Sequence, residues 1–184
     1  SGALLCLDVT EAVIEEASRL GFNLIVAHHP LLFRGVKCVS DRTQVQRCIR
    51  LAVQHDIAIY AAHTNLDNAR GGVNFEIAQR LGLERLDWLA PLAGQDAGSG
   101  LIGELPQPIA ATAWLETLKK TFGVEALLYA RGPQTEVRRI ALCGGAGEFL
   151  IDRAVQLGAD LFFTGEIGYH HFFGHENELW LAAL

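Results

Sequence analysis

Residues 23–30 read Asn-Leu-Ile-Val-Ala-His-His-Pro, an aliphatic run that ends in two adjacent histidines and a proline. Such a run is typical of a strand buried on both faces of a parallel sheet. Gly21 ends the helix that we expect before the strand, and Pro30 disfavours helical backbone at His29. His28 and His29 therefore sit at the carboxyl end of a central strand, where open α/β sheets bind their ligands.

Two interpretations of this histidine pair are open. Successive strand residues point to opposite faces, so both rings reach one site only if the chain turns at His28 and His29. In that arrangement they suit two metal ions lying side by side, with one imidazole for each ion. In the other interpretation they are a half-buried, hydrogen-bonded pair that binds no metal.

The composition excludes several classes of partner. The chain has 184 residues, enough for one large domain or two small ones, and 50% of them are hydrophobic. Its formal net charge is -6 and it has no run of Lys or Arg, which argues against direct nucleic-acid binding and against an anionic membrane surface. The four cysteines lack Cys-x-x-Cys spacing, and we find no signal peptide or membrane-length apolar segment. We therefore expect a cytoplasmic protein.

The sequence around the histidine strand predicts a β-α-β unit with parallel strands and a right-handed crossover. Residues 4–7 form the strand before it, and Thr10 caps the intervening helix. After it, residues 43–54 predict an amphipathic helix and residues 57–62 predict another buried strand. The polar residues 63–67, His-Thr-Asn-Leu-Asp, follow directly.

The predicted domain boundary lies in a change of composition. A helix is expected over residues 73–81, and residues 87–108 then become rich in Gly, Pro and Ala, with few charges. We expect an exposed loop over residues 94–100. The predicted domains are therefore residues 1–93, which carry the histidine motifs, and residues 94–184.

The second domain repeats a pattern of the first. Residues 11–24 match residues 148–161 at a constant offset, and at the same offset residues 5–6 fall on residues 142–143. One supersecondary unit is thus used twice. The predicted fold class is α/β, with two similar halves, largely parallel buried sheets and an internal β-α-β repeat.

This alignment places Gly165 and Glu166 at the positions of His28 and His29. Because both strand ends then carry polar groups, we expect an active cleft between the halves. Glu166 begins a second cluster of acidic residues and histidines over residues 164–175, for which a solvated loop is an equally open interpretation.

Two further motifs could carry chemistry. His63 and Asp67 lie four residues apart after a buried strand and could bind Zn, Mn or Fe, although Asp67 could instead organise a turn. Residues 144–147, Gly-Gly-Ala-Gly, lie between a strand and a helix. Their amides could bind a phosphate, or the glycines could form a tight packing turn.

Seven separated motifs run in order through nearly the whole chain. They are Leu-Asp-Val-Thr-Glu at 7–11, Ala-His-His-Pro at 27–30, His-Thr-Asn-Leu-Asp at 63–67, Gly-Val-Asn at 72–74, Gly-Glu-Leu at 103–105, Cys-Gly-Gly-Ala-Gly at 143–147 and Thr-Gly-Glu-Ile at 164–167. Together they resemble the Nif-three-like family, whose members are also called GTP cyclohydrolase 1 type 2 homologues.

The resemblance implies a two-domain α/β protein with a dinuclear metal site between the halves, assembled as a ring-shaped homohexamer of dimers. His28, His29 and Asp67 match the family's metal ligands, His63 matches a histidine that lines the site, and Glu166 lies in the family's Gly-Glu motif. An opening Asp-Asn-Val-Gly-Leu-like motif and a closing Gly-His-x-x-x-Glu-like motif are absent. We therefore expect this sequence to lack the family's terminal segments, including its last metal ligands.

The resulting hypothesis is a metal-dependent hydrolase that acts on a small nucleotide-like substrate, by its family name a purine nucleotide. Two divalent ions, Zn, Fe or Mn rather than Mg, would lower the pKa of bound water. Glu166 and His63 are the candidate catalytic residues. The candidate substrate-binding residues are Gly144, Gly145 and Gly147. The alternative is a metal-binding hexameric scaffold or regulatory interaction protein without turnover.

Overall fold

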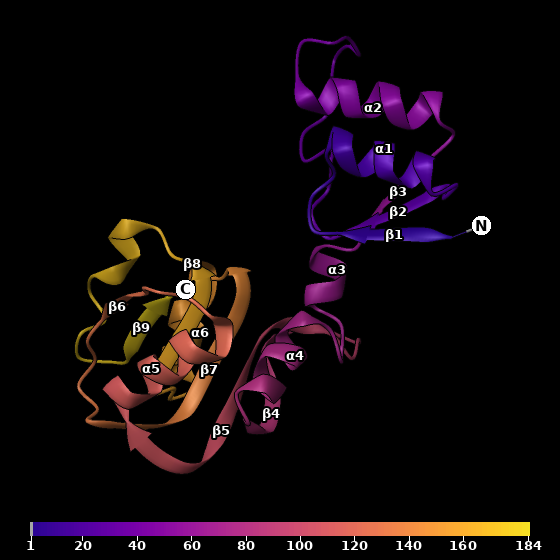
Figure 1. Ribbon diagram of the computed structural model, residues 1–184. Helices are drawn as coiled ribbons and strands as arrows, with labels where there is room; N and C mark the ends of the chain where they lie inside the picture. Colours follow the sequence, from indigo (N-terminus) through magenta and orange to yellow (C-terminus); the bar gives the residue numbers. More distant parts are fainter. Residues whose placement is uncertain (1) are drawn as a thin grey trace. The chain divides into compact units, whose positions relative to one another are not determined.

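The computed structural model describes residues 2–184, which form two compact units, Ser1–Asn65 and Leu66–Leu184 (Figure 1). The boundary therefore follows Asn65 and not the predicted position after residue 93. The reason is packing, since Ala78, Leu81 and Trp88 share one hydrophobic cluster with the rest of the second unit. No helix among the described residues is long and apolar enough to span a membrane.

The first unit is a three-stranded parallel sheet with two helices. Its elements are β1 (Ala3–Cys6), α1 (Glu11–Arg19), β2 (Leu24–Ala27), α2 (Gln44–Gln54) and β3 (Ala58–Ala61). The strand order is β1-β2-β3, and both pairings are parallel, as the sequence predicted. The hydroxyl oxygens of Thr10 and Thr43 accept hydrogen bonds from Val13 N–H and Gln46 N–H, which caps α1 and α2.

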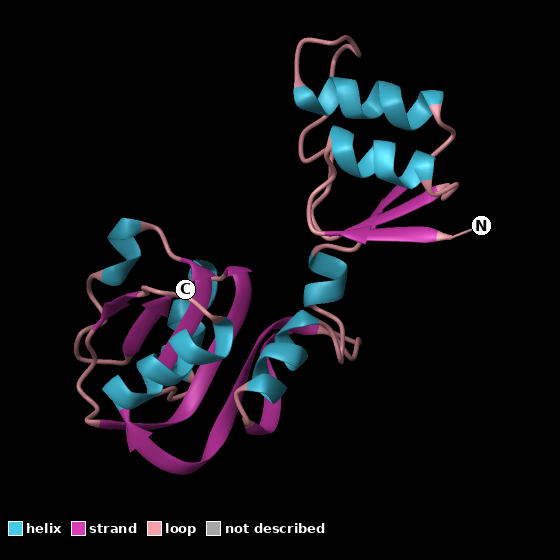
Figure 2. Cartoon of the chain, in the orientation of Figure 1, coloured by secondary structure: helices cyan, strands magenta, loops and turns pink. Residues whose placement is uncertain are grey.

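The sheet of this unit is covered on one face only, in contrast to the prediction of strands buried on both faces. Figure 2 shows α1 and α2 on the same side of the strands, where Ile14, Ile25 and Cys48 form the core. On the opposite face, Leu5 is 76% exposed and Tyr60 is 54% exposed. An aliphatic run predicts a strand but does not reveal which parts of the chain cover its two faces.

The second unit contains a six-stranded sheet of order β4-β5-β7-β8-β9-β6. The strands β7, β8 and β9 are parallel, and the other pairings are antiparallel, so the sheet is mixed. The elements are α3 (Thr64–Asp67), α4 (Val73–Arg80), β4 (Glu84–Pro91), β5 (Gly98–Ala110), α5 (Ala111–Phe122), β6 (Leu128–Ala130), β7 (Glu136–Ala146), η1 (Glu148–Leu150), α6 (Ile151–Gln156), β8 (Leu161–Glu166), η2 (Tyr169–Phe172) and β9 (Trp180–Ala183). The segment predicted as a domain junction is thus largely an antiparallel hairpin, β4 and β5.

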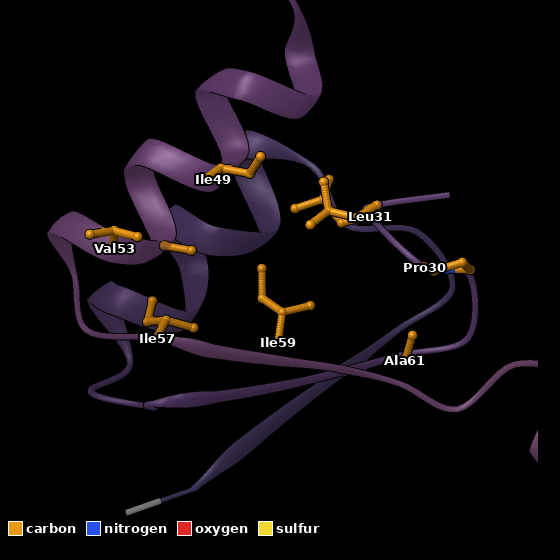
Figure 3. A pocket seen from close by; sticks show the side chains of 9 residues that line it. Pro30, Leu31, Ile49, Val53, Ile57, Ile59 and Ala61 are labelled. Atoms are coloured by element: carbon orange, nitrogen blue, oxygen red, sulfur yellow. The ribbon is translucent and has the colours of Figure 1, made fainter. Parts of the chain in front are cut away.

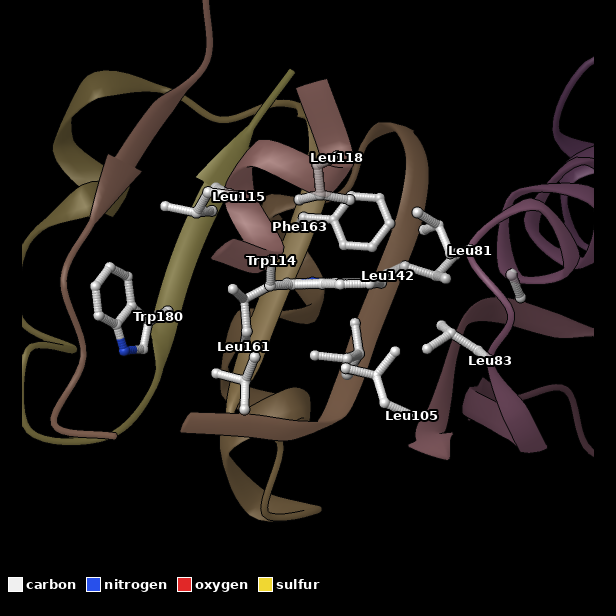
Figure 4. Close-up of a cluster of buried hydrophobic side chains, with 14 of the residues drawn as sticks. Leu81, Leu83, Leu105, Trp114, Leu115, Leu118, Leu142, Leu161, Phe163 and Trp180 are labelled. Carbon is white, nitrogen blue, oxygen red and sulfur yellow. The ribbon is translucent and has the colours of Figure 1, made fainter. Parts of the chain in front are cut away.

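Both faces of the second sheet are buried. Trp114 and Leu118 of α5 cover one face and contact a cluster that contains Phe163 of β8 (Figure 4). Ile151 and Ala154 of α6 belong to the cluster that contains Phe162, on the other face. Each β8 side chain from Leu161 to Thr164 is therefore buried.

The predicted internal repeat is present in detail. In the first unit Ala3 pairs with Leu24, and at the same offset Ile140 pairs with Leu161 in the second. The next three residue pairs also correspond. The turn after each helix is the same, because Gly21 and Gly158 both have a φ of 68°, in the left-handed region that glycine adopts without steric cost. The predicted fold class of two related α/β halves is therefore confirmed, although the second half adds three antiparallel strands.

Candidate metal centre

The carboxyl ends of the three strands in the first unit bring its histidines together. His28 and His29 follow β2 directly, and His63 lies two residues after β3. Backbone hydrogen bonds continue the parallel pairing into these ends: His29 N–H donates to Leu7 O at 2.9 Å, and Ala62 N–H donates to Ala27 O at 2.8 Å. Parallel strands end at one edge of the sheet, so residues distant in sequence converge there.

The three imidazole rings form one cluster. The ring centroids are 5.0 Å apart for His28 and His29, 5.3 Å for His28 and His63, and 5.8 Å for His29 and His63. Each residue offers a ring nitrogen, and these three atoms all lie within 4.8 Å of one another. Three imidazoles at this spacing suit Zn or another transition metal and do not suit Mg, which prefers oxygen ligands.

Hydrogen bonds fix the ring nitrogens of the histidine pair. His28 Nδ1 lies 2.8 Å from Ala62 O, and His29 Nδ1 lies 2.9 Å from Asp8 Oδ1. A carbonyl or carboxylate oxygen can only accept, so each Nδ1 carries the proton and the lone pair of the neutral ring is on Nε2. This arrangement is how histidine ligands of metal ions are usually oriented.

Asp8 is a functional candidate that the sequence analysis did not single out. It follows β1 by two residues, so it lies at the same edge of the sheet as the three histidines. Its position after a strand of the same β-α-β unit was a usable signal. The motif 7–11 was noted only as part of the family resemblance.

His63 was predicted to be a catalytic residue, and the structure places it beside His28 and His29, two of the three predicted ligands. Its Nδ1 lies 3.4 Å from Thr64 Oγ1, and its ring centroid lies 6.3 Å from that of the exposed Phe33. The position makes His63 a possible third ligand as well as a candidate proton carrier. Its catalytic role stays a prediction.

A hollow of about 270 Å³ lies beside the cluster in the first unit (Figure 3). Its walls are apolar and come from the segment after His29, from α2 and from β3, for example Pro30, Ile49 and Ile59. The nearest wall residues in sequence, Pro30 and Ala61, are one and two residues from the clustered histidines. An apolar hollow therefore lies next to the histidine cluster, on the α2 side of β3.

Asp67, the third predicted metal ligand, belongs to the second unit. Its backbone oxygen accepts a hydrogen bond of 2.8 Å from Asn74 Nδ2. Asn74 is fully buried, and its Oδ1 accepts a 2.7 Å bond from Gly144 N–H, which ties the Asp67 turn to the glycine motif. Burial, with a smaller contribution from the Asp67 charge, raises the pKa of the Cys143 thiol to about 11. A shared cluster of Asp67 with His28 and His29 stays a prediction.

Close packing explains why glycines occupy this motif. A Cβ on Gly147 would lie 2.6 Å from both Cys143 Cβ and Thr164 Oγ1, and Gly145 has a φ of 68°. The Gly144 amide already donates to Asn74. These contacts support the interpretation as a tight turn, and phosphate binding by Gly144, Gly145 and Gly147 stays a prediction.

Glu166 ends β8 and is exposed. It lines a hollow of about 240 Å³ together with Leu128, Gly165 and Leu184. The histidines that follow have local carboxylate neighbours: His175 Nδ1 lies 2.7 Å from Glu178 Oε2, and His171 Nε2 lies 3.7 Å from Glu148 Oε1. These two histidines of the second cluster thus lie in the mostly exposed segment after β8 and pair with carboxylates other than Glu166, and a catalytic role of Glu166 stays a prediction.

Comparison with known proteins identifies the relatives of this chain. The sequence profile of the family described as Duf34/NIF3 (NGG1p interacting factor 3) matches residues 1–182. A Clostridium perfringens (strain 13 / Type A) protein named GTP cyclohydrolase 1 type 2 homolog is 37% identical over 170 residues, which cover 91% of this chain and 64% of the relative. A Bacillus subtilis (strain 168) protein of the same name is 49% identical over 88 residues, which cover 48% of this chain and 24% of the relative.

Solved structures give the same result. The crystal structure of a Staphylococcus aureus hypothetical protein matches with a TM-score of 0.88 at 27% identity, over 99% of this chain and 73% of that one. A Bacillus cereus protein related to NIF3 matches with a TM-score of 0.87 at 25% identity, over 98% of this chain and 77% of that one. Against the first three curated relatives, the chain spans between 64% and 66% of their length.

Proposed function

The chain belongs to the Duf34/NIF3 family, and from that premise we propose that it is a metal-dependent hydrolase that acts on a nucleotide-like substrate. The observation that carries the proposal is the cluster of His28, His29 and His63 at the strand ends of the first unit. Three ring nitrogens within 4.8 Å of one another, with the Nδ1 atoms of His28 and His29 held by oxygen acceptors, suit the donor set of a transition-metal site.

The residues have separate tasks in this proposal. His28, His29 and Asp67 hold two divalent ions, Zn, Fe or Mn, and His63 completes the donor set or carries a proton. Asp8 and the Ala62 carbonyl keep the histidine pair in the correct tautomer. When bound, the divalent ions would lower the pKa of a coordinated water molecule and would polarise the substrate bond that this water attacks.

Glu166 orients the attacking water or accepts its proton. Its carboxylate lies exposed at the end of β8, and positioning is the larger part of its task. Gly145 and Gly147 would contact the phosphate of the substrate through their backbone amides. The purine nucleotide as substrate is taken from the name of the relatives, GTP cyclohydrolase 1 type 2 homolog. The hexameric assembly is proposed from the family resemblance, and the cytoplasmic location is proposed from the cysteine spacing and the sequence composition.

A metal-binding scaffold without turnover is the second candidate. The family description names an interacting factor, and one face of the first sheet exposes the apolar residues Leu5 and Tyr60. Such a face suits a protein partner or a further copy of the chain. In that case the histidine cluster would hold a structural ion.

The test measures metal binding and GTP turnover separately. We expect a protein that spans the full length of the curated relatives to bind Zn²⁺ or Mn²⁺ in a titration, and His29→Ala in that protein to abolish both binding and turnover. His55→Gln is the matched control, because His55 lies at the end of α2 and bonds to Ser18, outside the cluster. Glu166→Gln should keep the metal but lower turnover roughly 10²–10⁴-fold, the range for a positioned acid–base group. Metal binding without turnover would support the scaffold, and no metal binding would overturn both candidates.

A further inference from the structure

The second unit contains a hollow that the proposed hydrolase does not use. It lies between the edge strand β6 and the segment that follows β8, and its volume is about 450 Å³. Its apolar walls include Leu128, Ile167 and Phe172. The segment after β8 leaves the carboxyl end of a parallel strand, the place where open α/β sheets commonly bind ligands.

Aromatic rings form much of the wall. Tyr169 and Phe173 lie with ring centroids 5.1 Å apart at an interplanar angle of 68°, so their faces point in different directions. Tyr129 stacks on Trp180 at 5.9 Å and 25°, which fixes the plane of its ring. Tyr129, Tyr169 and Phe173 are 55%, 72% and 54% exposed, so each presents ring surface to a ligand. The face of an aromatic ring carries negative potential.

A single carboxylate completes the lining. Glu176 is the one charged side chain among the described residues that line the hollow. Gly174 N–H lies 3.2 Å from Glu176 Oε1 and 3.1 Å from Oε2. Backbone N–H groups, of Glu176 itself and then of Gly174, lower the pKa of this carboxyl, so it is ionised at neutral pH. The ring faces and the carboxylate therefore both contribute negative potential to the lining of the hollow.

We propose that this hollow binds a small organic cation with an apolar surface, of the quaternary or alkylated ammonium class. Aromatic faces attract such a cation within about 6 Å of the ring centre, and the attraction is larger for cations that lose little hydration. The apolar wall residues contact its methyl groups, and Glu176 neutralises its charge. A phosphate or carboxylate ligand would be repelled, and a divalent metal would find one carboxylate and no further oxygen cluster.

An arginine of the protein makes a cation–π contact near the hollow. The Arg131 guanidinium carbon lies 5.8 Å from the centre of the Trp180 ring, which is the ring that Tyr129 stacks on. Trp180 thus already takes part in one cation–π contact. The proposal concerns the second unit alone and holds or fails independently of the metal site.

The test uses choline and its neutral carbon isostere, 3,3-dimethylbutan-1-ol, which has the same shape without the charge. Binding is followed by NMR shifts of the aromatic side chains and by calorimetry on the full chain. We expect choline to bind roughly 3–30-fold more tightly than the isostere, the ratio that about 0.5–2 kcal/mol of cation–π attraction gives. Equal affinities would show an apolar hollow only and would overturn the proposal.

Variants separate the contributions. Phe173→Leu keeps an apolar wall and removes a ring face, and Glu176→Gln keeps the shape and removes the charge. Each should weaken choline binding roughly 3–10-fold and leave the isostere unchanged, as expected for one cation–π or carboxylate contact at a half-exposed site. Phe149→Leu is the control, because Phe149 is 67% exposed but does not line the hollow. A different result would overturn the proposal: the chain self-associates, Phe173→Leu abolishes the self-association, and choline does not bind. The hollow would then be a contact surface for a second copy of the chain.

Discussion

The sheet β1-β2-β3 and the strands β7-β8-β9 are two versions of one parallel motif in different surroundings. Leu5 and Leu142 occupy equivalent positions, yet Leu5 is 76% exposed and Leu142 is fully buried. The second motif lies inside a six-stranded sheet with a helix on each face, whereas the first has helices on one face. The same strand pattern is therefore compatible with very different burial, which depends on the elements added around it.

The strand ends of the two motifs differ in chemistry. His28 and His29 correspond to Gly165 and Glu166, and Asp8 corresponds to Gly145. The first motif ends in imidazoles, of which His29 is oriented by Asp8, and the second ends in a tight turn of glycines. Among the described residues, the repeated scaffold carries a histidine cluster in its first copy, so the difference between the copies lies in a few residues and not in the fold.

The largest expected effect tests the difference in burial. Leu142→Ala should lower the free energy of unfolding by about 2–5 kcal/mol, because it leaves a cavity in a fully buried cluster. Leu5→Ala, at the equivalent exposed position, should change it by about 0.5 kcal/mol or less. Urea denaturation of the two variants and the wild type gives both values.

If Leu5→Ala lowers the free energy of unfolding almost as much as Leu142→Ala does, the two positions do not differ in burial. It would mean that the open face of the first sheet is covered in solution. Repeating the Leu5→Ala measurement at several protein concentrations separates coverage by a second copy from coverage within the chain, since only the former depends on concentration.

The second effect tests the difference in chemistry at the strand ends. Asp8→Ala should weaken Zn²⁺ binding roughly 10–100-fold, the usual effect of losing a carboxylate that orients a histidine ligand. Asp8→Asn retains a hydrogen-bond acceptor without the charge, so its loss should be smaller. Glu16→Ala, a surface carboxylate of α1, is the control. Unchanged Zn²⁺ affinity in Asp8→Ala would show that the Asp8–His29 contact has no part in metal binding.

The sequence predicted the repeat because its helix turns and strand registers depend on local features. Gly21 and Gly158 end the two helices, and the aliphatic strand residues recur at the same offset. The convergence of His28, His29 and His63 follows from the parallel order of the strands, which the β-α-β pattern predicts. The family match confirmed the recognition made from the motifs.

The remaining features depend on contacts between distant residues. The predicted exposed loop over residues 94–100 contains the start of β5, because Gly98 and Gly100 weaken the strand pattern there. In the structure, Gly98 and Gly103 lie where a Cβ would approach Trp88 and Leu86 within 3.0 Å, so these glycines permit close packing of the hairpin. The open face of the first sheet also depends on the elements around it, which no local pattern describes.

A smaller effect tests the turn that replaces the histidines in the second motif. Thr164 is fully buried, and its hydroxyl donates a 2.7 Å hydrogen bond to Gly145 O. Thr164→Val keeps the shape and leaves this carbonyl without that donor, which should cost about 1–3 kcal/mol of unfolding free energy. Thr164→Ser retains the hydroxyl and is the matched control. A small loss in Thr164→Val together with a larger loss in Thr164→Ser would assign the effect to the methyl group and not to the hydrogen bond.

The smallest effect compares the equivalent cysteines Cys6 and Cys143. Burial raises the pKa of both thiols, with smaller contributions from Asp8 and Asp67, and for Cys143 the folded value is about 11, against 9.0 for an ordinary thiol. Above pH 9 the unfolded chain loses this proton while the folded chain keeps it, so Cys143 favours unfolding progressively between pH 9 and 11. At pH 10 the loss of unfolding free energy is about 1 kcal/mol, since one pKa unit corresponds to 1.36 kcal/mol.

Urea denaturation between pH 9 and 11 checks this. The stability of Cys143→Ala should depend less on pH than that of the wild type, and Cys6→Ala should differ less from the wild type, because Cys6 is only partly buried. Identical pH profiles for all three proteins would show that the two cysteines have similar surroundings, and the contrast between the motifs would then be limited to their aliphatic residues.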